Sequence, residues 1–358
     1  MSIVPIDLQT QGNYEQLFRG NYNKGLRVFK SCMIQDDLRE QLITDAGALN
    51  CVFTNINYAA ASGKLALAMN EFDEIVPAFN NYCATKGIAV KSTLAQTWAD
   101  ATCKAAMLAD SDIMAAIGAC SKLGDVCQLD FLTRLKIAIN NGNYVSAFPL
   151  GTTVDIACSS MSFGGSSFSA ATTTFEVIGH DQDVDTSGNT LPITFATKDL
   201  HTGTTFKMYS SNVNTVTSSY PYTQRAALLG CLPSTWQSAI ATTRKQVCQA
   251  GDTATLINYD AGAFLLRERE IFGSKSYCRQ EEYNVAFQYQ AFEQGIASKV
   301  KKLNNGAGSA NTWWEISPYS GNANYFCCVT SSGNADAYTA SNTFGLCFGF
   351  ALKRNQTV

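Results

Sequence analysis

Apolar and polar residues alternate with helical spacing through the first 140 residues of the chain. Residues 34–49 and 64–80 place Leu, Ile and Phe between charged residues at intervals of three or four, until Pro77 interrupts the second run. Residues 92–140 contain almost no Gly or Pro apart from Gly118 and Gly124, and their apolar residues recur at the same interval. The first 140 residues are therefore predicted to be largely helical.

One apolar stripe within this segment has two interpretations. It consists of Cys103, Met107, Met114, Ile117, Cys120, Leu123 and Cys127. The simpler interpretation is the core-facing side of an ordinary helix. The alternative starts from the run ATCKAAMLADSDIMAAIGACSKL, in which Met is followed by small residues. This run resembles the Ala/Met/Ser linkers of bacteriophage tail-fibre proteins, and the resemblance implies an oligomeric stalk.

The pattern changes at the turn cluster formed by residues 140–143. Short β-branched and apolar runs then alternate with clusters of Gly, Ser, Asn and Thr, which predicts strands. These runs are residues 152–158, 174–179, 191–197, 204–210, 325–330 and 346–352. Residues 222–247 and 284–303 look helical. We therefore predict an α+β protein in which an N-terminal α-helical region precedes a mixed α/β domain. The expected regions are 1–90, 91–143 and 144–358.

The charge content excludes several classes of protein. Charged residues make up 15% of the 358 residues, against about 25% in typical proteins, so Ser, Thr, Asn and Gly must cover much of the surface. The net charge of −3 gives no electrostatic drive toward nucleic acid, which we do not expect as a partner. Neither a basic-then-apolar leader nor about 18 consecutive apolar residues occur, so we expect no signal peptide and no membrane insertion.

The 13 cysteines are dispersed and include no C-x-x-C pair. We expect most of them to be free, buried thiols that behave as small hydrophobic residues. The alternative is disulfide formation in a particle that leaves the cell.

Candidate catalytic and metal-binding residues are few. His180 and His201, the only histidines, are expected to be surface or hydrogen-bonding residues. Asp181, Asp183 and Asp185 alternate as calcium ligands do, but the sixth and twelfth loop positions hold Thr and Pro instead of Gly and Glu. A solvated turn is the expected structure. No nucleotide, hydrolase or metalloprotease motif occurs, so we expect no catalytic residue, no metal and no cofactor.

The C-terminal segment carries the most distinctive pattern. Between Leu303 and Leu352 only Glu315 and Asp336 are charged. The order is a Gly/Ser/Asn turn, Trp-Trp-Glu-x-Ser-Pro, two polar stretches and a closing Gly-x-x-Phe-Gly-Phe. This order resembles the C-terminus of phage and prophage virion proteins with a C-type-lectin-like domain, a fold also used by the variable proteins of diversity-generating retroelements. The upstream runs NGNYVSAFPLGTTVDI, PITFATKDL and LLREREIFG agree, so the resemblance covers about residues 140–358.

The resemblance implies a division between scaffold and contact residues. Trp313, Trp314, Phe348 and Phe350 would form the scaffold. The contact candidates are Tyr319, Ser320, Asn322, Asn324, Tyr325, Asp336, Tyr338, Ser341 and Asn342. Most are of the types that antibody paratopes use. The Glu-Pro-Asn or Gln-Pro-Asp and Trp-Asn-Asp motifs of calcium-dependent lectins are missing, so a glycan or protein would be bound without calcium.

The resemblance also implies a function. We expect a non-enzymatic bacteriophage structural protein located in the virion. Residues 1–90 would attach it to other virion proteins, 91–143 would form a linker or stalk, and 144–358 would act as a tail-fibre adhesin on a host-surface glycan or protein. A homotrimer is expected by analogy with fibres. The alternatives are a capsid decoration or head-fibre protein and, from another class, an enzyme of the formylglycine-generating fold or a glycosidase.

Overall fold

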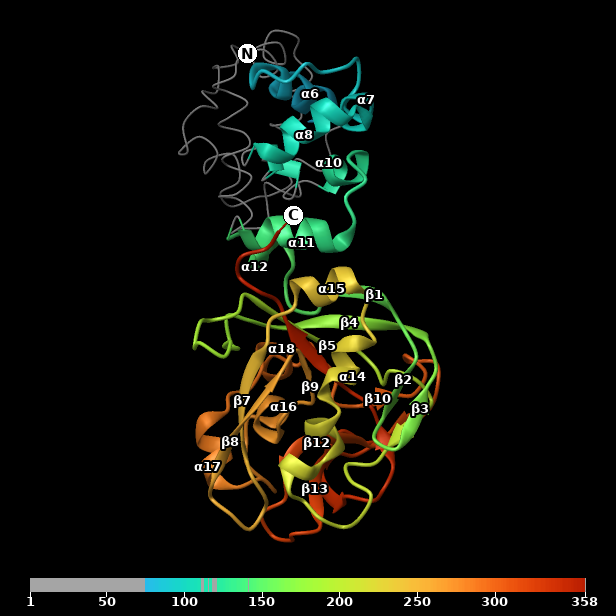
Figure 1. The fold of residues 1–358 in the computed structure, drawn as a ribbon, viewed down its shortest axis with the longest axis vertical. Coiled ribbons are helices and arrows are strands. Elements are labelled where there is room, and N and C mark those ends of the chain that lie inside the picture. The colour runs from blue at the N-terminus through green and yellow to red at the C-terminus, as the bar shows by residue number, and fades with distance from the viewer. Residues whose placement is uncertain (1–74, 111–112, 115, 118–120, 141, 358) are drawn as a thin grey trace, which may run out of the picture. The chain divides into compact units, whose positions relative to one another are not determined.

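The computed structural model describes residues 75–110, 113, 114, 116, 117, 121–140 and 142–357 (Figure 1). The chain divides into two compact units with a boundary between Ala147 and Phe148. The predicted helix at 34–49 and most of the one at 64–80 lie outside the described residues. Among the described helices, none combines the length and the apolar character needed to cross a membrane.

The described part of the first unit is helical. Its helices are α6 (Ile75–Thr85), α7 (Leu94–Ala99), α8 (Ala101–Ala109), α10 (Ser121–Val126), α11 (Phe131–Asn140) and α12 (Tyr144–Ala147). The predicted interruption at Pro77 is wrong, since α6 continues through it to Thr85.

Aspartates divide the 92–140 segment into short helices. The Oδ1 of Asp100 accepts hydrogen bonds from the backbone N of Thr102 and Cys103 at 3.1 and 3.0 Å. Asp130 does the same for the N of Thr133 at 2.7 Å. An Asp at this position satisfies the free N–H groups of a helix start. The described part of the segment is thus a series of short helices and not one long helix.

The apolar stripe of this segment faces the interior of the first unit. Cys120 lies outside the described residues, and the other six residues of the stripe are all buried. Helix α6 packs against both α7 and α10, and α7 packs against α8. The core-facing interpretation is confirmed for these six residues, whereas a stalk made by several chains stays a prediction.

The second unit contains two five-stranded sheets. The first sheet is antiparallel throughout, with the order β1 (Thr153–Cys158), β4 (Ala171–His180), β5 (Ile193–Thr197), β16 (Gly349–Ala351) and β9 (Ala263–Phe264). Because the first and last strands of the unit share this sheet, the chain enters and leaves the unit at the end opposite β13 (Figure 1).

The second sheet has the order β14 (Ala335–Thr339), β13 (Tyr325–Val329), β12 (Trp313–Pro318), β15 (Phe344–Gly345) and β6 (Thr205–Phe206). Strands β12 and β15 are parallel, and the other neighbours are antiparallel. Three hairpins complete the strands. They are β2 (Met161–Phe163) with β3 (Ser166–Phe168), β7 (Thr243–Cys248) with β8 (Leu256–Ala261), and β10 (Lys301–Lys302) with β11 (Ala310–Asn311).

Short helices cover the sheets of the second unit. They are η1 (Val216–Ser218), α13 (Tyr220–Thr223), α14 (Arg225–Gly230), α15 (Ser234–Ala239), α16 (Glu268–Phe272), α17 (Gln280–Val285) and α18 (Gln290–Glu293). The α+β class is confirmed for the described residues. Every predicted strand overlaps a strand of the structure, although 204–210 contains only Thr205–Phe206.

Both long helices predicted for this unit are wrong in part. The end of 222–247 is strand β7, in which Thr243, Lys245 and Val247 are buried on alternate positions. Because charged Lys245 occupies the buried face, the sequence shows no apolar alternation here. In 284–303 helix α18 ends at Glu293, because the chain turns at Gly295 with a φ of 69° and then enters β10.

The core of the second unit is aromatic. Trp313, Trp314, Phe348 and Phe350 are all 0% exposed, as the scaffold prediction requires. Both tryptophans are buried because every residue of β12 is buried, so the strand is covered on both faces. Each indole N–H finds a backbone acceptor at 3.0 Å, the carbonyl of Lys299 for Trp313 and that of Phe206 for Trp314.

Candidate contact surface

The nine predicted contact residues gather on one end of the second unit. They lie on the loop between β12 and β13, on β13 and β14, and on the loop after β14, at the lower end of Figure 1. None of them is buried. The exposed ones are Ser320, Asn322, Asn324 and Tyr338, and the half-buried ones are Tyr319, Tyr325, Asp336, Ser341 and Asn342. We call these nine residues the contact surface.

Tyr338 connects the contact surface to the core. It lies on β14, the edge strand of the second sheet, and its side chain is 39% exposed. Its ring centroid lies 5.2 Å from that of Phe344, which in turn lies 4.5 Å from that of buried Trp314. The neighbouring Asp336 carboxylate raises the pKa of the Tyr338 hydroxyl, so the phenol stays protonated at neutral pH. The edge strand thus presents a supported aromatic ring with a hydrogen-bonding hydroxyl.

The β12–β13 loop is held in place from beneath. The side-chain amide of buried Asn214 donates to the carbonyls of Tyr319 and Asn322 at 3.1 and 3.0 Å. A Cβ on Gly251 would lie 1.9 Å from the carbonyl oxygen of Tyr319, so only glycine fits beneath this loop. The loop is therefore preorganised, which lowers the entropic cost of binding.

A further tyrosine, Tyr277, belongs to this surface. Its ring centroid lies 5.4 Å from that of Tyr319, and Tyr319 lies 6.2 Å from Tyr325. The N and Oγ of Ser320 donate to the carbonyl of Tyr277 at 2.9 and 2.8 Å. Neither Tyr277 nor Asn214 was predicted from the sequence. Asn214 lies in a low-charge Ser/Asn run like those of the C-terminus, whereas Tyr277 lies between Lys275 and Arg279 in a charged segment that gives no such signal.

A buried carboxylate fixes the backbone around Tyr277. Glu268, which is 0% exposed, accepts hydrogen bonds from the backbone N of Ser276 at 3.0 Å, Tyr277 at 2.8 Å and Cys278 at 2.6 Å. Three N–H donors compensate the loss of water around the carboxylate. Glu268 is therefore a positioning residue for the tyrosine cluster.

Two further carboxyl groups lie in the same region of the core. Glu282 accepts from the N of Cys248 at 2.9 Å and hydrogen-bonds to Ser317, and burial raises its pKa to about 7. Glu315 is 0% exposed, neither of its carboxyl oxygens has a hydrogen-bond partner among the described residues, and burial raises its pKa far above the usual range. Burial without a hydrogen-bond partner therefore favours the protonated, neutral form of the Glu315 carboxyl group.

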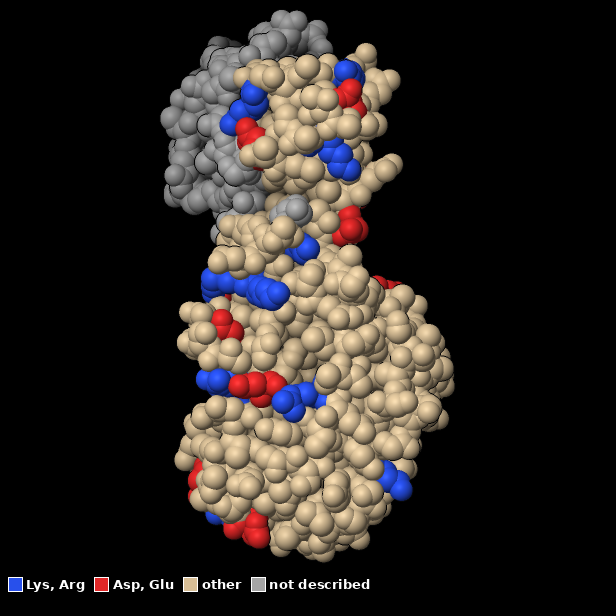
Figure 2. All heavy atoms as spheres, in the orientation of Figure 1, with Lys and Arg blue, Asp and Glu red and all other residues tan. Residues whose placement is uncertain are grey.

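The chemistry of the contact surface is hydrogen bonding and aromatic contact. Its side chains are Tyr, Asn and Ser with the single carboxylate of Asp336. Figure 2 shows that charged side chains are scattered over the visible face and that most of it is uncharged. The cysteines below the surface, Cys327 and Cys328, are buried, and burial raises the pKa of both thiols. They are therefore thiols and not reactive thiolates at neutral pH.

The aspartates of 181–185 do not converge on one point. Asp183 is buried and accepts from the hydroxyls of Thr194 and Tyr289, each at 2.7 Å. Asp185 accepts from the N of Asn189 within its own turn, and Asp181 pairs with Arg354. No group of His, Cys, Asp or Glu in the described residues is arranged to hold a metal. The solvated-turn prediction is wrong for Asp183, which the buried Lys245 draws into the core.

Both histidines are buried hydrogen-bonding residues. The Nδ1 of His201 lies 2.6 Å from the Oγ1 of Thr173, and the Nε2 of His180 lies 2.9 Å from the carbonyl of Phe148. Burial lowers the pKa of His201 to about 4, so its ring is neutral at pH 7. Of the two expected roles, surface or hydrogen-bonding residue, the hydrogen-bonding role is confirmed for both histidines.

The ten cysteines in the described part of the chain are all free and buried, as predicted. Cys32, Cys51 and Cys120 lie outside that part.

Comparisons with known proteins gave no further assignment. No protein-family model, no curated protein and no solved structure matches the chain.

Proposed function

We propose that this chain is a bacteriophage structural protein whose region 144–358 has a C-type-lectin-like fold and binds the host surface as a tail-fibre adhesin. The sequence resemblance at residues 301–352 motivates the proposal. The α+β unit supports it, because its chain ends leave at one end and its polar loops occupy the other (Figure 1). That arrangement suits an attached domain that presents one surface.

One observation carries the proposal. Residues that the resemblance assigns to contact are exposed or half-buried and adjacent, whereas the four scaffold aromatic residues are all 0% exposed. Substitutions on the contact surface would therefore change recognition without removing core packing. Uncharged Asn, Ser and Tyr side chains suit a host glycan or a polar protein surface.

The proposed setting is the virion. Residues 1–90 would attach the chain to other virion proteins, and 91–143 would link this part to the adhesin. In a homotrimer three weak contact surfaces would bind together and gain from avidity. No cofactor, metal or nucleic acid takes part in the proposed function.

An enzyme of the formylglycine-generating fold, one of the two enzyme alternatives, would need a reactive cysteine. Cys327, Cys328 and Cys347 are buried, and burial raises the pKa of each thiol. Because a nucleophilic or redox-active thiol needs a lowered pKa and access to its substrate, these observations favour the adhesin.

Binding of the full-length protein to the bacterium that the particle infects tests the proposal. Tyr319→Ala and Tyr338→Ala should each lower binding about tenfold or more, as loss of an aromatic interface anchor does. Ile296→Ala is the matched control, because Ile296 is an exposed hydrophobic residue, 45% exposed, beside Gly151. Lack of binding by the wild-type protein, together with immunogold labelling on the capsid, would replace the adhesin with the decoration protein.

A further inference from the structure

The ammonium group of Lys245 is enclosed in the core of the second unit. Its Nζ lies 2.5 Å from the Oδ1 of Asp183, 2.7 Å from the Oε1 of Glu270 and 2.5 Å from the hydroxyl of Tyr289. The side chains of the lysine and of both acids are at most 1% exposed, and the ring centroid of Phe264 lies 4.3 Å from Nζ. An amine and a carboxyl group are thus in contact where bulk water does not reach.

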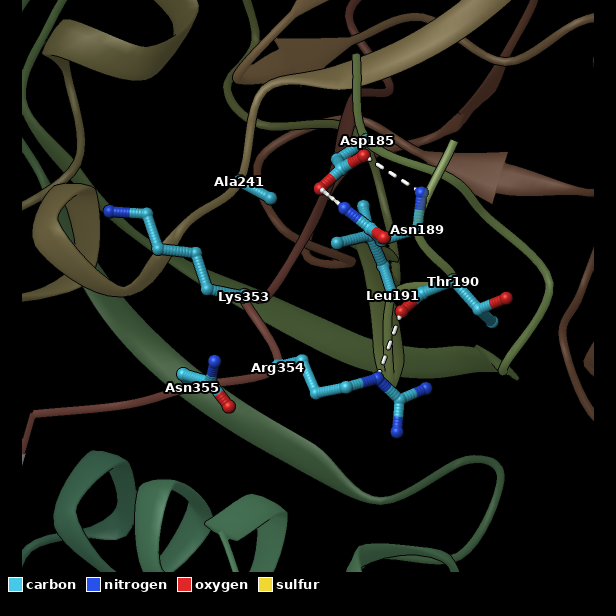
Figure 3. Close-up of a pocket in the computed structure, with 8 residues that line it drawn as sticks. All are labelled: Asp185, Asn189, Thr190, Leu191, Ala241, Lys353, Arg354 and Asn355. Atoms are coloured by element: carbon cyan, nitrogen blue, oxygen red, sulfur yellow. Dashed lines mark hydrogen bonds between the residues drawn. The ribbon is translucent and has the colours of Figure 1, made fainter. Parts of the chain in front are cut away.

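Backbone pairing places Asp183 directly opposite Lys245. Asp185 and Thr243 form an antiparallel bridge, so the same register sets residue 183 across from residue 245. The Cβ atoms of such a pair lie about 4.5–5.5 Å apart. The turn that follows lines a surface pocket and is also fixed, because the Asp185 carboxylate accepts from the backbone N and the side-chain amide of Asn189 at 2.9 and 3.0 Å (Figure 3). The two side chains are therefore brought together by the backbone.

The two carboxyl groups beside the ammonium have different partners. Arg267 donates to both oxygens of Glu270, from Nη2 to Oε1 and from its backbone N to Oε2, each at 2.8 Å. These donors favour the carboxylate form of Glu270, which can accept a proton. The Oδ2 of Asp183 instead accepts from two neutral hydroxyls, those of Thr194 and Tyr289, each at 2.7 Å. Because these hydroxyls can stabilise negative charge that develops on Oδ2, Asp183 is the carboxyl group suited to attack by an amine.

We infer that Lys245 and Asp183 form an intramolecular isopeptide bond, for which the ion pair in the structure is the state before reaction. Nζ passes a proton to Glu270 and attacks the Cγ of Asp183, so that a C–N bond forms and the bond from Cγ to Oδ1 breaks. Of the three ammonium protons, two leave with Oδ1 as water, one of them by way of Glu270, and the third stays on the amide nitrogen. The two charges cancel, and no oxidant or cofactor is consumed. The inference is independent of the proposed adhesin function.

Burial favours this condensation, which an amine and a carboxylate in water do not undergo. A buried ion carries a large desolvation penalty, and the neutral amide removes one buried cation and one buried anion. The fixed contact also replaces an encounter in solution, because well-oriented reacting groups can reach effective concentrations of about 10⁵–10⁸ M. The core therefore supplies both the driving force and the proximity.

A second buried lysine, Lys301, lacks this arrangement. Its Nζ lies 3.7 Å from the Oε1 of Glu176, and the two side chains are 0% and 5% exposed. The same nitrogen donates to the backbone carbonyls of Thr197 and Lys198 at 2.7 and 2.8 Å. Because its nitrogen is held by carbonyls and the acid is farther away, we expect no bond between Lys301 and Glu176.

Intact-protein mass spectrometry of the full-length protein tests the bond. The mass should be lower than the sequence mass by one water molecule. Trypsin should release residues 137–198 joined to residues 245–267, because it does not cleave after an acylated lysine. Fragmentation of this species should place the link between Asp183 and Lys245, and Lys301 should be recovered unmodified.

Three variants separate the bond from other losses of water. Lys245→Arg should keep its full sequence mass, because a guanidinium does not form the amide. Glu270→Gln should slow bond formation about 10²–10⁴-fold, since Gln accepts no proton, and should be recovered mainly at its full sequence mass. Lys301→Arg is the matched control and should lose one water as the wild type does.

Three results would overturn the inference. The first is a wild-type protein that stays at its full sequence mass after prolonged incubation at neutral pH, a result that needs no variant to fold. The second is a loss of water that persists in Lys245→Arg. The third is a link from Lys245 to a carboxyl group other than that of Asp183.

Discussion

The Nζ of Lys245 lies 2.7 Å from the Oε1 of Glu270, and both side chains are 0% exposed. Lys245 also binds Asp183, and Arg267 donates to the same Glu270 oxygen at 2.8 Å. Two cations therefore face two anions within the core. The ammonium of Lys245 further lies 4.3 Å from the ring centroid of Phe264. The network joins β7 to the 181–185 segment and to α16, which are distant in sequence.

Lys245→Met should destabilise the protein by about 3–5 kcal/mol, because breaking a buried ion pair leaves an uncompensated charge. The measurement is urea unfolding of the full-length protein. Lys302→Met is the control, since Lys302 is exposed on β10 and should change stability by less than about 0.5 kcal/mol. Equal unfolding midpoints for the two variants would show that the network contributes no net stability.

The strands could be predicted from sequence where apolar side chains occupy the buried face, as in β4 and β13. Strand β7 could not, because a charged residue, Lys245, occupies its buried face. The same applies to Asp183, because two of its partners, Lys245 and Tyr289, lie 62 and 106 residues further along the chain. Whether a charged residue is buried depends on partners distant in sequence, so the local pattern of apolar and polar residues does not predict it.

The contact surface likewise has a part that could be predicted from the sequence and a part that could not. Its nine residues are close in sequence and lie in the segment whose motif order carries the resemblance, so the resemblance identified them together. Tyr277 and Asn214 reach it through long-range contacts. These are hydrogen bonds to Ser320, Tyr319 and Asn322 and the ring contact between Tyr277 and Tyr319. The supporting carboxylate of Glu268 was equally hidden, because nothing in the run LLREREIFG distinguishes a buried Glu from a solvated one.

Glu282 makes stability depend on pH. Its pKa of about 7 in the folded protein lies above the ordinary value of 4.5, so the folded state holds a proton that the unfolded state has released. Stability from this group is complete below about pH 4.5 and is lost as the pH rises to about 7. At about 1.4 kcal/mol per pKa unit, the loss is about 3 kcal/mol.

Glu282→Gln tests this dependence, because Gln is neutral at every pH and can still accept from the N of Cys248. The variant should gain stability over the wild type as the pH rises from about 4.5 to about 7. The measurement is chemical unfolding at a series of pH values. Parallel stability curves for the two proteins would contradict a raised pKa at Glu282.

Truncation of Trp314 should mainly lower stability, whereas truncation of Tyr338 should mainly lower host binding. The rings of both residues contact Phe344. Trp314→Ala should cost about 3–5 kcal/mol of stability, as for other buried aromatic residues. Tyr338→Ala should cost less than about 1 kcal/mol and lower host binding. Tyr338→Phe should keep the ring contact and lose only the part of binding that depends on the hydroxyl. A Tyr338→Ala variant with unchanged host binding would remove this residue from the contact surface.

Cys158 and Cys231 should form a disulfide under oxidation. The neighbouring Cys231 thiol lowers the pKa of the Cys158 thiol, and the N of Ser159 donates to the carbonyl of Cys231 at 2.7 Å. The Cys158 thiolate attacks oxidised glutathione, and Cys231 then displaces glutathione from the mixed disulfide, so that two protein thiols become one disulfide and two glutathione molecules are released.

Peptide mass spectrometry after oxidation should therefore find Cys158 and Cys231 in one cross-linked species that has lost two hydrogens. Cys83→Ser serves as the control, since Cys83 is another buried thiol, whose pKa burial raises to about 12, and its loss should not affect the cross-link. Cys231→Ser should leave Cys158 as a mixed disulfide with glutathione, because the resolving thiol is gone. Recovery of both cysteines only as free thiols, under conditions that oxidise an exposed dithiol, would show that their burial prevents the exchange.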